Sequence, residues 1–574
     1  MTTPYAEEPS PHPGAFPAAA FAGLGARMRA SLEKLPALPH WVVPVLLFVV
    51  ALAMRAPLFG NALIYNDEDF YLYGGGQMWL GRWPYLDIWD RKPFGLFALF
   101  AFFHAFGPWR FWAYQLCATG CVWLTALLVR RMALLIASPG GAFVAAVFYI
   151  VALEIRKGFG GQTPVFYNLL VACAFWLVVS QMEALQRQPA RLRLTGLVCM
   201  GLFGLALQLK PTVVFEGMFL GLFLLWLGWK GGQKPLALLL DGMLWVAAAL
   251  LPTVLVVLGY VLTGHGREWW FANILSFFHR ANAPEPRDVR QLLVIVGIFL
   301  LCGWVFTWAQ KTRFSAAQKR AYLFLSAWAL VALGAVWLVG GYFIHYALPL
   351  MLPLSILVAP VWQERTGKLL LIAVLVALIS SGVRQVRHIA KKRGIETYRE
   401  IVRTLSDPPG CVFEYLATPI LMDATPQAAR CQLTRWPFPA HLGLRREQGA
   451  MGVTPDEGTE VTRIFAAHPR YVVINDFFQD PKDEGVPATD LAVIRHLLAD
   501  YEPVYLHRRS QPVPGRVAQV PPAAAAALVA AMHTRLQGPL KEGKRADVDF
   551  SIWRLRPGLQ ADLPRPDLSG PAVQ

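Results

Sequence analysis

The residues best suited to chemistry gather in one segment, 66–106, between two strongly apolar stretches. Its charged side chains are five carboxylates and three cations: Asp67, Glu68, Asp69, Asp87, Asp90, Arg82, Arg91 and Lys92. A carboxylate can take a proton from an attacking hydroxyl or amine, and a lysine can hold a phosphate at headgroup depth. This combination just outside a membrane span predicts an active site on one face of a membrane.

The two acids near the start of this segment, Asp67 and Glu68, are the predicted catalytic residues. We expect a general base here, which activates an acceptor for its attack. The alternative is structural, because N-D-E-D before FYLYGGGQMWL is typical of a helix whose first acids cap it. Tyr71, in the same stretch, is a further candidate for the site.

The run Asp90-Arg91-Lys92-Pro93 predicts the phosphate-binding part of the site. Lys92 precedes a proline that starts an apolar helix, so its ammonium is placed at headgroup depth. The alternative is a lysine that snorkels from that helix to the interface and needs no partner. The neighbouring acids Asp87 and Asp90 favour the phosphate site.

Further polar residues are expected at the same face, because they lie at the outer ends of later apolar segments. They are Lys210, His279, Arg280, Tyr342, His345 and Tyr346. Polar groups at this depth are costly unless they pair or serve a site. A single histidine or tyrosine would be an ordinary interfacial residue, whereas several on one face indicate a shared site.

The composition sets the class of protein. Of 574 residues, 55% are hydrophobic and 16% are charged, and the mean hydropathy is +0.42, which is too apolar for a soluble protein of this length. Apolar runs of about 20 residues, the length that crosses a bilayer, recur along the chain. The net charge of +16 comes from cations in short loops, which is an orientation signal and excludes a nucleic-acid-binding stripe. We therefore expect a polytopic α-helical membrane protein.

Eleven membrane spans are predicted, at Trp41–Leu58, Phe111–Val129, Gly140–Glu154, Val165–Gln181, Leu194–Leu209, Val213–Trp229, Leu236–Leu262, Gln291–Ala309, Tyr322–Val339, His345–Trp362 and Lys368–Val383. Phe94–Phe106 is too short to cross and is expected to lie in the outer interface. With this count the basic turns face the cytoplasm and the C-terminus lies outside. Residues 1–39, rich in Pro, Ala and Gly, are expected to form a disordered cytoplasmic tail.

The predicted domains follow from these spans. Residues 40–385 form the membrane domain, with a large first outer loop at 59–109, and residues 386–574 form an outer α/β domain with a Pro- and Ala-rich tail. Within that domain, strands are predicted at 411–417, 471–475, 501–509 and 550–557, and helices at Ile395–Ser406 and Thr489–Asp500. Cys411 and Cys431 also lie there, and the sequence leaves open whether they form a disulfide.

Two sets of motifs carry a resemblance to a known family. The first is D-E at Asp67 and Glu68, followed by G-x-x-P-Y-x-D-x-x-D-x-K-P-x-G-L at 81–96. The second is the ordered series GGQTPVFYNLL (160–170), GLALQLKPT (204–212) and HYALPLMLP (345–353). The chain resembles the GT-C superfamily of integral-membrane glycosyltransferases. The likeness is greatest to the branch that holds the bacterial lipid A aminoarabinose transferases and the protein O-mannosyltransferases.

This resemblance implies a polyprenyl-phosphate-linked sugar as donor and an acceptor at the outer side of the bacterial inner membrane. By position, Asp67 matches the first-loop acid that acts as catalytic base, and Lys92 matches the lysine that binds the donor phosphate. Arg280 and Tyr346 lie where an arginine and a tyrosine share the phosphate. Arg91, beside Lys92, is expected to contribute to the same phosphate site.

Two departures from the family pattern matter. Arg91 stands where the aminoarabinose transferases carry Glu, which weakens an aminoarabinose assignment. Gln162, Thr163 and Asn168 lie in a stretch where many relatives have an acid, which weakens a metal requirement. No cofactor is implied, and a divalent metal is compatible with the pattern without being implied by it.

The predicted function is inverting transfer of a hexosyl or pentosyl unit from polyprenyl phosphate to a lipid, glycan or protein of the cell envelope. A base and a phosphate-binding group on opposite sides of the sugar give direct displacement, and fixed cations stabilise the departing phosphate. Two alternatives stay open: a transporter or flippase for a lipid-linked saccharide, and a polymerase or ligase of surface polysaccharide. A transporter would carry ionisable groups at the bilayer midplane in two repeated halves, whereas most of these lie at outer ends.

Overall fold

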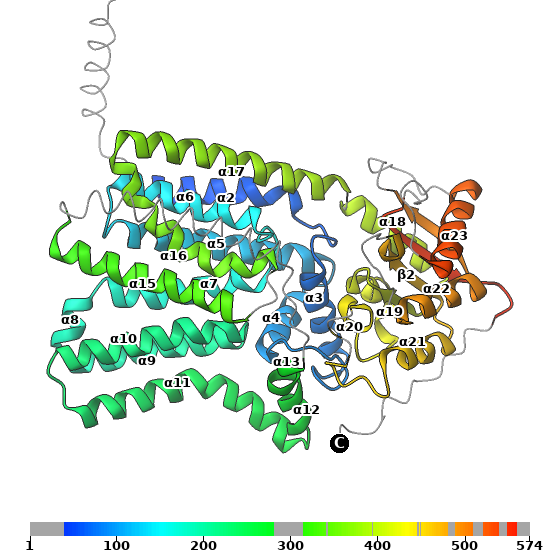
Figure 1. Cartoon of the computed structure of the whole chain (residues 1–574), viewed down its shortest axis with the longest axis horizontal. Coiled ribbons are helices and arrows are strands. Elements are labelled where there is room, and N and C mark those ends of the chain that lie inside the picture. The colour runs from blue at the N-terminus through cyan, green and yellow to red at the C-terminus, as the bar shows by residue number, and fades with distance from the viewer. Residues whose placement is uncertain are drawn as a thin grey trace, which may run out of the picture. The chain divides into compact units, whose positions relative to one another are not determined.

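The fold is described by a computed structural model. It covers residues 39–279, 314–339, 343–392, 394–444, 447, 449–479, 488–508, 520–538 and 548–559. This part of the chain is mostly helical and includes a small C-terminal sheet, as the sequence predicts (Figure 1). From Leu47 onward the chain packs as one unit.

Apolar helices make this a multi-pass membrane protein. Among the described residues, seven helical segments are long and apolar enough to cross a membrane: Gly107–Ala133, Pro189–Leu207, Pro211–Lys230, Pro235–Leu262, Ala316–Leu338, Ile344–Gln363 and Arg365–Ser406. Four shorter apolar segments are Val42–Leu58, Phe94–His104, Pro139–Ile155 and Thr163–Val179. The predicted span Gln291–Ala309 lies outside the described residues, so the total of eleven stays a prediction.

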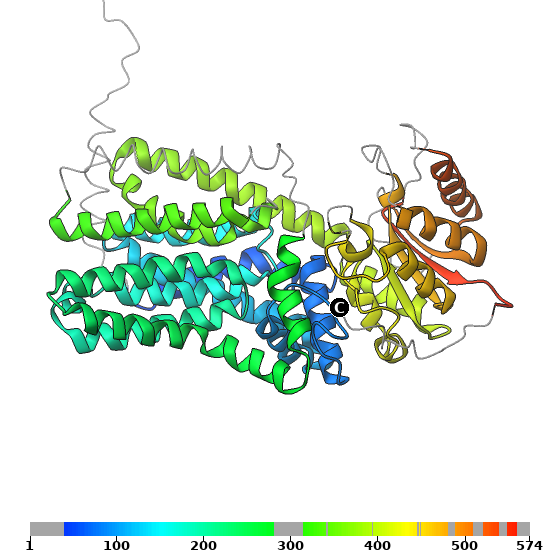
Figure 2. The same ribbon diagram turned by 60° about the horizontal axis from the view of Figure 1, so that its bottom comes forward.

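The helices of this part have the following bounds: α2 (Val42–Arg55), α5 (Arg110–Ala133), α6 (Pro139–Ile155), α7 (Thr163–Val179), α8 (Met182–Arg187), α9 (Pro189–Leu207), α10 (Val214–Lys230), α11 (Pro235–Leu262), α12 (Gly266–Trp270), α13 (Ser276–Phe278), α15 (Ala316–Val339) and α17 (Arg365–Lys392). Both views show α9, α10 and α11 running side by side (Figures 1 and 2). Helix α17 is longer at both ends than the span predicted for it.

The predicted span His345–Trp362 forms as three pieces instead of one helix. They are the 3-10 turn Ile344–Ala347, helix α16 (Leu348–Leu357) and the 3-10 segment Ala359–Gln363. Pro349 and Pro360 explain the breaks, because each lies in the first turn of a new piece and lacks an N–H, whereas Pro353 lies inside α16. His345 and Tyr346 are therefore presented from a tight turn at one end of the span.

The first loop folds as two helices, α3 (Asn66–Trp79) and α4 (Phe94–His104), joined by residues 80–93. A methyl group at Gly75 would overlap the backbone of Phe100 and Ala101, so the glycine lets the two helices approach closely. Helix α3 begins after Tyr65 without a side-chain cap, and its acids lie inside its first turn. The helix therefore starts where the structural alternative predicts, but the acids do not cap it.

The described residues of the C-terminal domain form a four-stranded sheet with helices around it, and the four predicted strands and two predicted helices are all present. The strands β1 (Val412–Tyr415), β2 (Tyr471–Asn475), β3 (Tyr501–His507) and β4 (Phe550–Leu555) are ordered β1-β2-β4-β3, with β1 and β2 parallel and the other pairs antiparallel. The helices are α18 (Ile395–Ser406), α19 (Pro426–Arg430), α20 (Pro439–Gly443), α21 (Glu457–Ala466), α22 (Ala488–Asp500) and α23 (Pro522–Gln537). Cys411 and Cys431 are joined by a disulfide.

This domain also holds the connection between α3 and α4. The Trp89 N–H donates to the carbonyl of Arg435 at 2.7 Å, and the Gln432 side chain donates to the carbonyl of Asp87 at 2.6 Å. The indole of Trp89 lies in the apolar core of the domain. These contacts fix residues 80–93 against a segment that lies about 350 positions later in the sequence.

Candidate active site

Six of the predicted site residues come together at one end of the helices. This group, the rim cluster, consists of Asp67, Tyr71, Lys92, Lys210, His345 and Tyr346. They arrive from α3, the 80–93 connection, the end of α9 and the 3-10 turn before α16. Residues that are far apart in the sequence therefore converge, as their placement at outer span ends predicts.

Asp67 is the acid of the rim cluster. Its Oδ2 accepts a hydrogen bond from Gln162 Nε2 at 3.2 Å and lies 3.8 Å from His345 Nε2. The other ring nitrogen of His345 is 3.3 Å from the hydroxyl of Tyr65. The carboxylate is held on two sides and its side chain keeps 14% exposure, so a small group can still reach it.

Lys92 is the central cation. Its ammonium lies 3.5 Å from Asp90 Oδ1 and 5.6 Å from the centre of the Tyr71 ring, and its side chain is 30% exposed. Burial alone would lower the pKa of Lys92, but the negative charges of Asp90 and Asp67 raise it. Lys92 is thus fully charged at neutral pH, and it is close enough to Asp67 for the two charges to act on each other.

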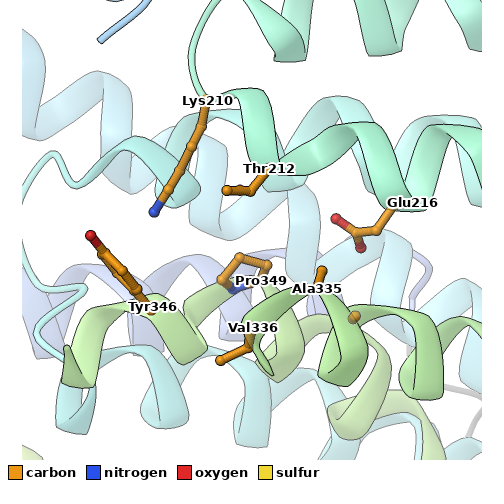
Figure 3. Close-up of a pocket in the computed structure, with 8 residues that line it drawn as sticks. Lys210, Thr212, Glu216, Ala335, Val336, Tyr346 and Pro349 are labelled. Atoms are coloured by element: carbon orange, nitrogen blue, oxygen red, sulfur yellow. The ribbon is translucent and has the colours of Figure 1, made fainter. Parts of the chain in front are cut away.

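A cleft opens beside the rim cluster between α10, α15 and α16, and Figure 3 shows its lining. At one end the ammonium of Lys210 lies 4.5 Å from the Tyr346 ring, with the tyrosine hydroxyl turned toward the lysine. At the other end Glu216 reaches in from α10 and accepts a hydrogen bond from Trp328 Nε1 at 2.6 Å. Burial, together with the charge of Lys92, lowers the pKa of Lys210 to about 8.

Glu68 points away from this cluster into the protein. Its side chain is fully buried against Gly160 and Tyr114. Burial raises the pKa of Glu68 to about 7, although Gly161 and Arg55 act in the opposite direction. Next to it the Arg55 guanidinium donates to Glu154 at 3.1 Å and to the Gly158 carbonyl at 2.6 Å. This network holds the 158–162 turn, which carries the Gln162 that contacts Asp67.

Three other candidates have partners elsewhere. The Arg91 guanidinium pairs with Glu447 at 2.6 Å and contacts Ser276 and the Ala450 carbonyl, so it ties the first loop to the C-terminal domain. Asp87 accepts the N–H of Trp83 within its own turn. His279 is exposed and bonds the carbonyl of Leu275. Arg280 and Tyr342 lie outside the described residues.

Several residues at the site were missed by sequence reasoning. Gln162 contacts Asp67, Tyr65 contacts His345, and Glu216 lines the cleft. His441 of α20 lies 3.5 Å from Asp90. Of these residues, only Gln162 could have been found from the sequence, since it lies in the motif GGQTPVFYNLL (160–170) that carries the resemblance. Among the described residues, no three His, Cys, Asp or Glu side chains lie together as metal ligands would.

Comparison with solved structures identifies the architecture. ArnT from Cupriavidus metallidurans in the apo state aligns with a TM-score of 0.50 and 16% identity, over 86% of this chain and 97% of that one. The archaeal oligosaccharyltransferase AglB from Archaeoglobus fulgidus, in complex with an inhibitory peptide and a dolichol-phosphate, aligns with a TM-score of 0.51 and 11% identity, over 90% and 88%. Both are GT-C superfamily glycosyltransferases. This chain has the GT-C fold. No family model matches the sequence, and neither does any curated protein.

On the GT-C fold the rim cluster has a clear chemical capability. The carboxylate of Asp67 lies close enough to Lys92 and Lys210 to act on their charges, and aromatic rings lie beside both lysines. The cations can stabilise negative charge that develops on a phosphate oxygen, because a poorly hydrated site strengthens such interactions. The carboxylate can accept a proton from a nucleophile on the other side.

Proposed function

We propose that the protein is an inverting glycosyltransferase that moves a sugar from a polyprenyl-phosphate donor to an acceptor of the cell envelope. The observation that carries this proposal is the convergence of Asp67 with Lys92, Lys210 and Tyr346 on a GT-C fold. The dolichol-phosphate in the AglB structure is consistent with a lipid phosphate at such a site. The sugar is a hexose or pentose, and the acceptor is a lipid, a glycan or a protein.

The reaction follows from the charges. Lys92 and Lys210, with the Tyr346 hydroxyl, bind the donor phosphate, and Asp67 lies on the opposite side of the sugar. The acceptor oxygen or nitrogen forms a bond to the anomeric carbon while the bond from that carbon to the phosphate oxygen breaks. The proton of the acceptor passes to Asp67, and polyprenyl phosphate leaves with the bonding electron pair. Attack from the face opposite the leaving group inverts the anomeric configuration.

The remaining candidates take supporting roles in this proposal. Asp67 is exposed to the site and Glu68 is buried, which supports Asp67 as the base and Glu68 as part of the network behind it. Arg280, which follows α13 in the sequence, is the further candidate for the phosphate. Lys92 binds the donor phosphate without help from Arg91 in this proposal, because the Arg91 guanidinium forms an ion pair with Glu447.

We also propose that this chemistry takes place at the periplasmic face of a bacterial inner membrane. Residues 1–39 are then a cytoplasmic tail, 40–385 the membrane domain and 386–574 a periplasmic domain. The disulfide of the C-terminal domain supports this orientation, because such bonds persist in oxidising compartments. A reporter fused after Asp407 is expected to read periplasmic, and a cytoplasmic signal would overturn the orientation.

Mass analysis of the lipid that copurifies with the protein tests the activity. We expect a polyprenyl phosphate or its glycosylated form, and we expect added donor to be converted to free polyprenyl phosphate when envelope membranes supply the acceptor. A flippase would bind the same lipid and leave the sugar–phosphate bond intact, so an unchanged donor would support that alternative. A polymerase or ligase would give products with more than one sugar added to the acceptor.

A further inference from the structure

We propose that His441, in helix α20 of the C-terminal domain, is a positioning residue for Lys92 and acts through Asp90. This inference rests on the proposed function, in which Lys92 binds the donor phosphate. It gives the C-terminal domain a part in donor binding, beyond covering the first loop. Three observations support it: the contacts of Asp90, the packing of His441 and the charge balance of the buried group.

Asp90 holds both ends of the lysine residue. Its Oδ1 accepts the backbone N–H of Lys92 at 2.9 Å and lies 3.5 Å from the Lys92 ammonium. The hydroxyl of Tyr85 donates to the Lys92 carbonyl at 2.9 Å and fixes the same residue from another side. At 3.5 Å the contact between ammonium and carboxylate is long, so it orients Lys92 and leaves N–H groups for a phosphate.

His441 occupies the other oxygen of Asp90. Its Nε2 lies 3.5 Å from Asp90 Oδ2, and both side chains are only 4% exposed. The imidazole packs against the rings of Trp89 and Phe438, with centroids 5.2 and 5.3 Å away, so it has little freedom to turn. Phe438 also places its ring 5.8 Å from the Lys92 ammonium, which is a second contribution of the same segment to this cation.

The charge balance explains why this partner matters. Burial alone would raise the pKa of Asp90, but Lys92, His441 and Arg91 hold it well below its usual range, so the carboxylate stays charged. Removing one partner of a buried carboxylate takes away an interaction that holds it in place. Without His441 the carboxylate is expected to lose its fixed orientation, so that it no longer holds Lys92 in place for the donor phosphate.

The test measures binding of undecaprenyl phosphate to the full-length protein in lipid nanodiscs. His441→Phe keeps a ring in the same place and removes the N–H donor, and it is expected to weaken binding about tenfold. His441→Gln keeps a donor and is expected to stay within about threefold of wild type. The matched control is His507→Phe in strand β3. His507 is a half-buried histidine that also lies 3.5 Å from an aspartate and stacks on a ring, and this variant is expected to bind undecaprenyl phosphate normally.

Asp90→Asn provides a second route if His441→Phe does not fold. The substitution removes the negative charge through which Asp90 holds Lys92 and contacts His441. It is expected to reduce binding of undecaprenyl phosphate to a similar degree. When both variants fold, adding His441→Phe to Asp90→Asn should cause little further loss, because the two residues act in series. Wild-type affinity in folded His441→Phe or in Asp90→Asn would overturn the inference, and so would equal losses in the Phe and Gln variants.

Lys92→Ala separates this inference from the function on which it rests. If Lys92→Ala binds undecaprenyl phosphate as tightly as wild type, the phosphate site of the proposed function is wrong. If Lys92→Ala weakens binding while folded His441→Phe does not, the phosphate site stands and the positioning role of His441 is refuted.

Discussion

Replacing Asp67 by Asn is the most direct test of the proposed chemistry. The substitution keeps the shape of the side chain and removes its ability to accept a proton. Gln162 can still donate to the new side chain, because its contact of 3.2 Å with Oδ2 needs only an acceptor, which an amide oxygen provides. The neighbouring His345, at 3.8 Å, is too distant for a strong bond that the change could break. We therefore expect the Asp67→Asn protein to fold normally.

The expected loss is in the chemical step alone. A positioned general base contributes about 10²- to 10⁴-fold, so we expect kcat to fall by about 10³-fold, or roughly 4 kcal/mol of barrier. Donor affinity should not fall. Asp67 lies close enough to Lys92 to influence its pKa, and removing this negative charge leaves the phosphate-binding cations at least as attractive to an anion. We expect the donor Kd to stay within about threefold of wild type.

The assay follows release of polyprenyl phosphate from labelled donor in proteoliposomes, with envelope membranes as the source of acceptor. Asp500→Asn is the matched control, because Asp500 also lies 3.8 Å from a histidine nitrogen, that of His496, in the C-terminal domain. Normal turnover is expected for this control. An Asp67→Asn enzyme that retains more than a tenth of wild-type kcat would refute the base assignment. A parallel loss of donor binding would instead indicate that the site had collapsed.

Four further perturbations have expected outcomes. Lys92→Ala should weaken donor binding by about 30-fold, the loss of one charge-assisted contact, and a titration with undecaprenyl phosphate checks this. Because burial lowers the pKa of Lys210 to about 8, donor affinity should decrease as the pH rises through about 8, and an affinity that is flat from pH 6 to 9 would contradict it. Burial raises the pKa of Glu68 to about 7, so the protonated side chain stabilises the fold at low pH and this contribution is lost as the pH rises from 4.5 to 7. Glu68→Gln lacks this loss. The stability of Glu68→Gln minus that of wild type, measured by thermal unfolding, should therefore be on the order of 3 kcal/mol larger at pH 8 than at pH 4.5. Removing the Cys411–Cys431 bond, which closes a loop of 20 residues, should destabilise the C-terminal domain by about 3 kcal/mol in denaturant, and an unchanged midpoint would count against it.

Much of the fold could be predicted from the sequence because the signals are local. Long apolar runs indicate the helices, and short runs of β-branched and aromatic residues indicate buried strands such as Tyr471–Asn475. The convergence of Asp67, Lys92, Lys210 and Tyr346 could also be predicted, because a membrane places all outer span ends at the same depth. The depth of a residue is encoded locally even when its neighbours are distant in the sequence.

Pairings across long separations could not be predicted in this way. Arg91 looks like a phosphate ligand beside Lys92, but its partner is Glu447, far along the chain. Glu216 is an isolated charge near the start of a span until Trp328 is seen to donate to it. The position of His441 depends on how α20 packs against the first loop, which no periodicity encodes. The sequence prediction of a span at 345–362 agrees with the helical segment Ile344–Gln363, but it did not show that this segment is divided into two 3-10 pieces and helix α16.

The contact between Arg91 and Glu447 has a consequence for how the protein is made. The two residues are 356 positions apart, so the ribosome must add more than half of the chain before they can meet. A nascent chain whose helices are already inserted therefore still lacks the ion pair between Arg91 and Glu447 that holds its first loop. Translation that stops before Glu447 therefore leaves membrane helices whose first loop lacks its contact with the C-terminal domain.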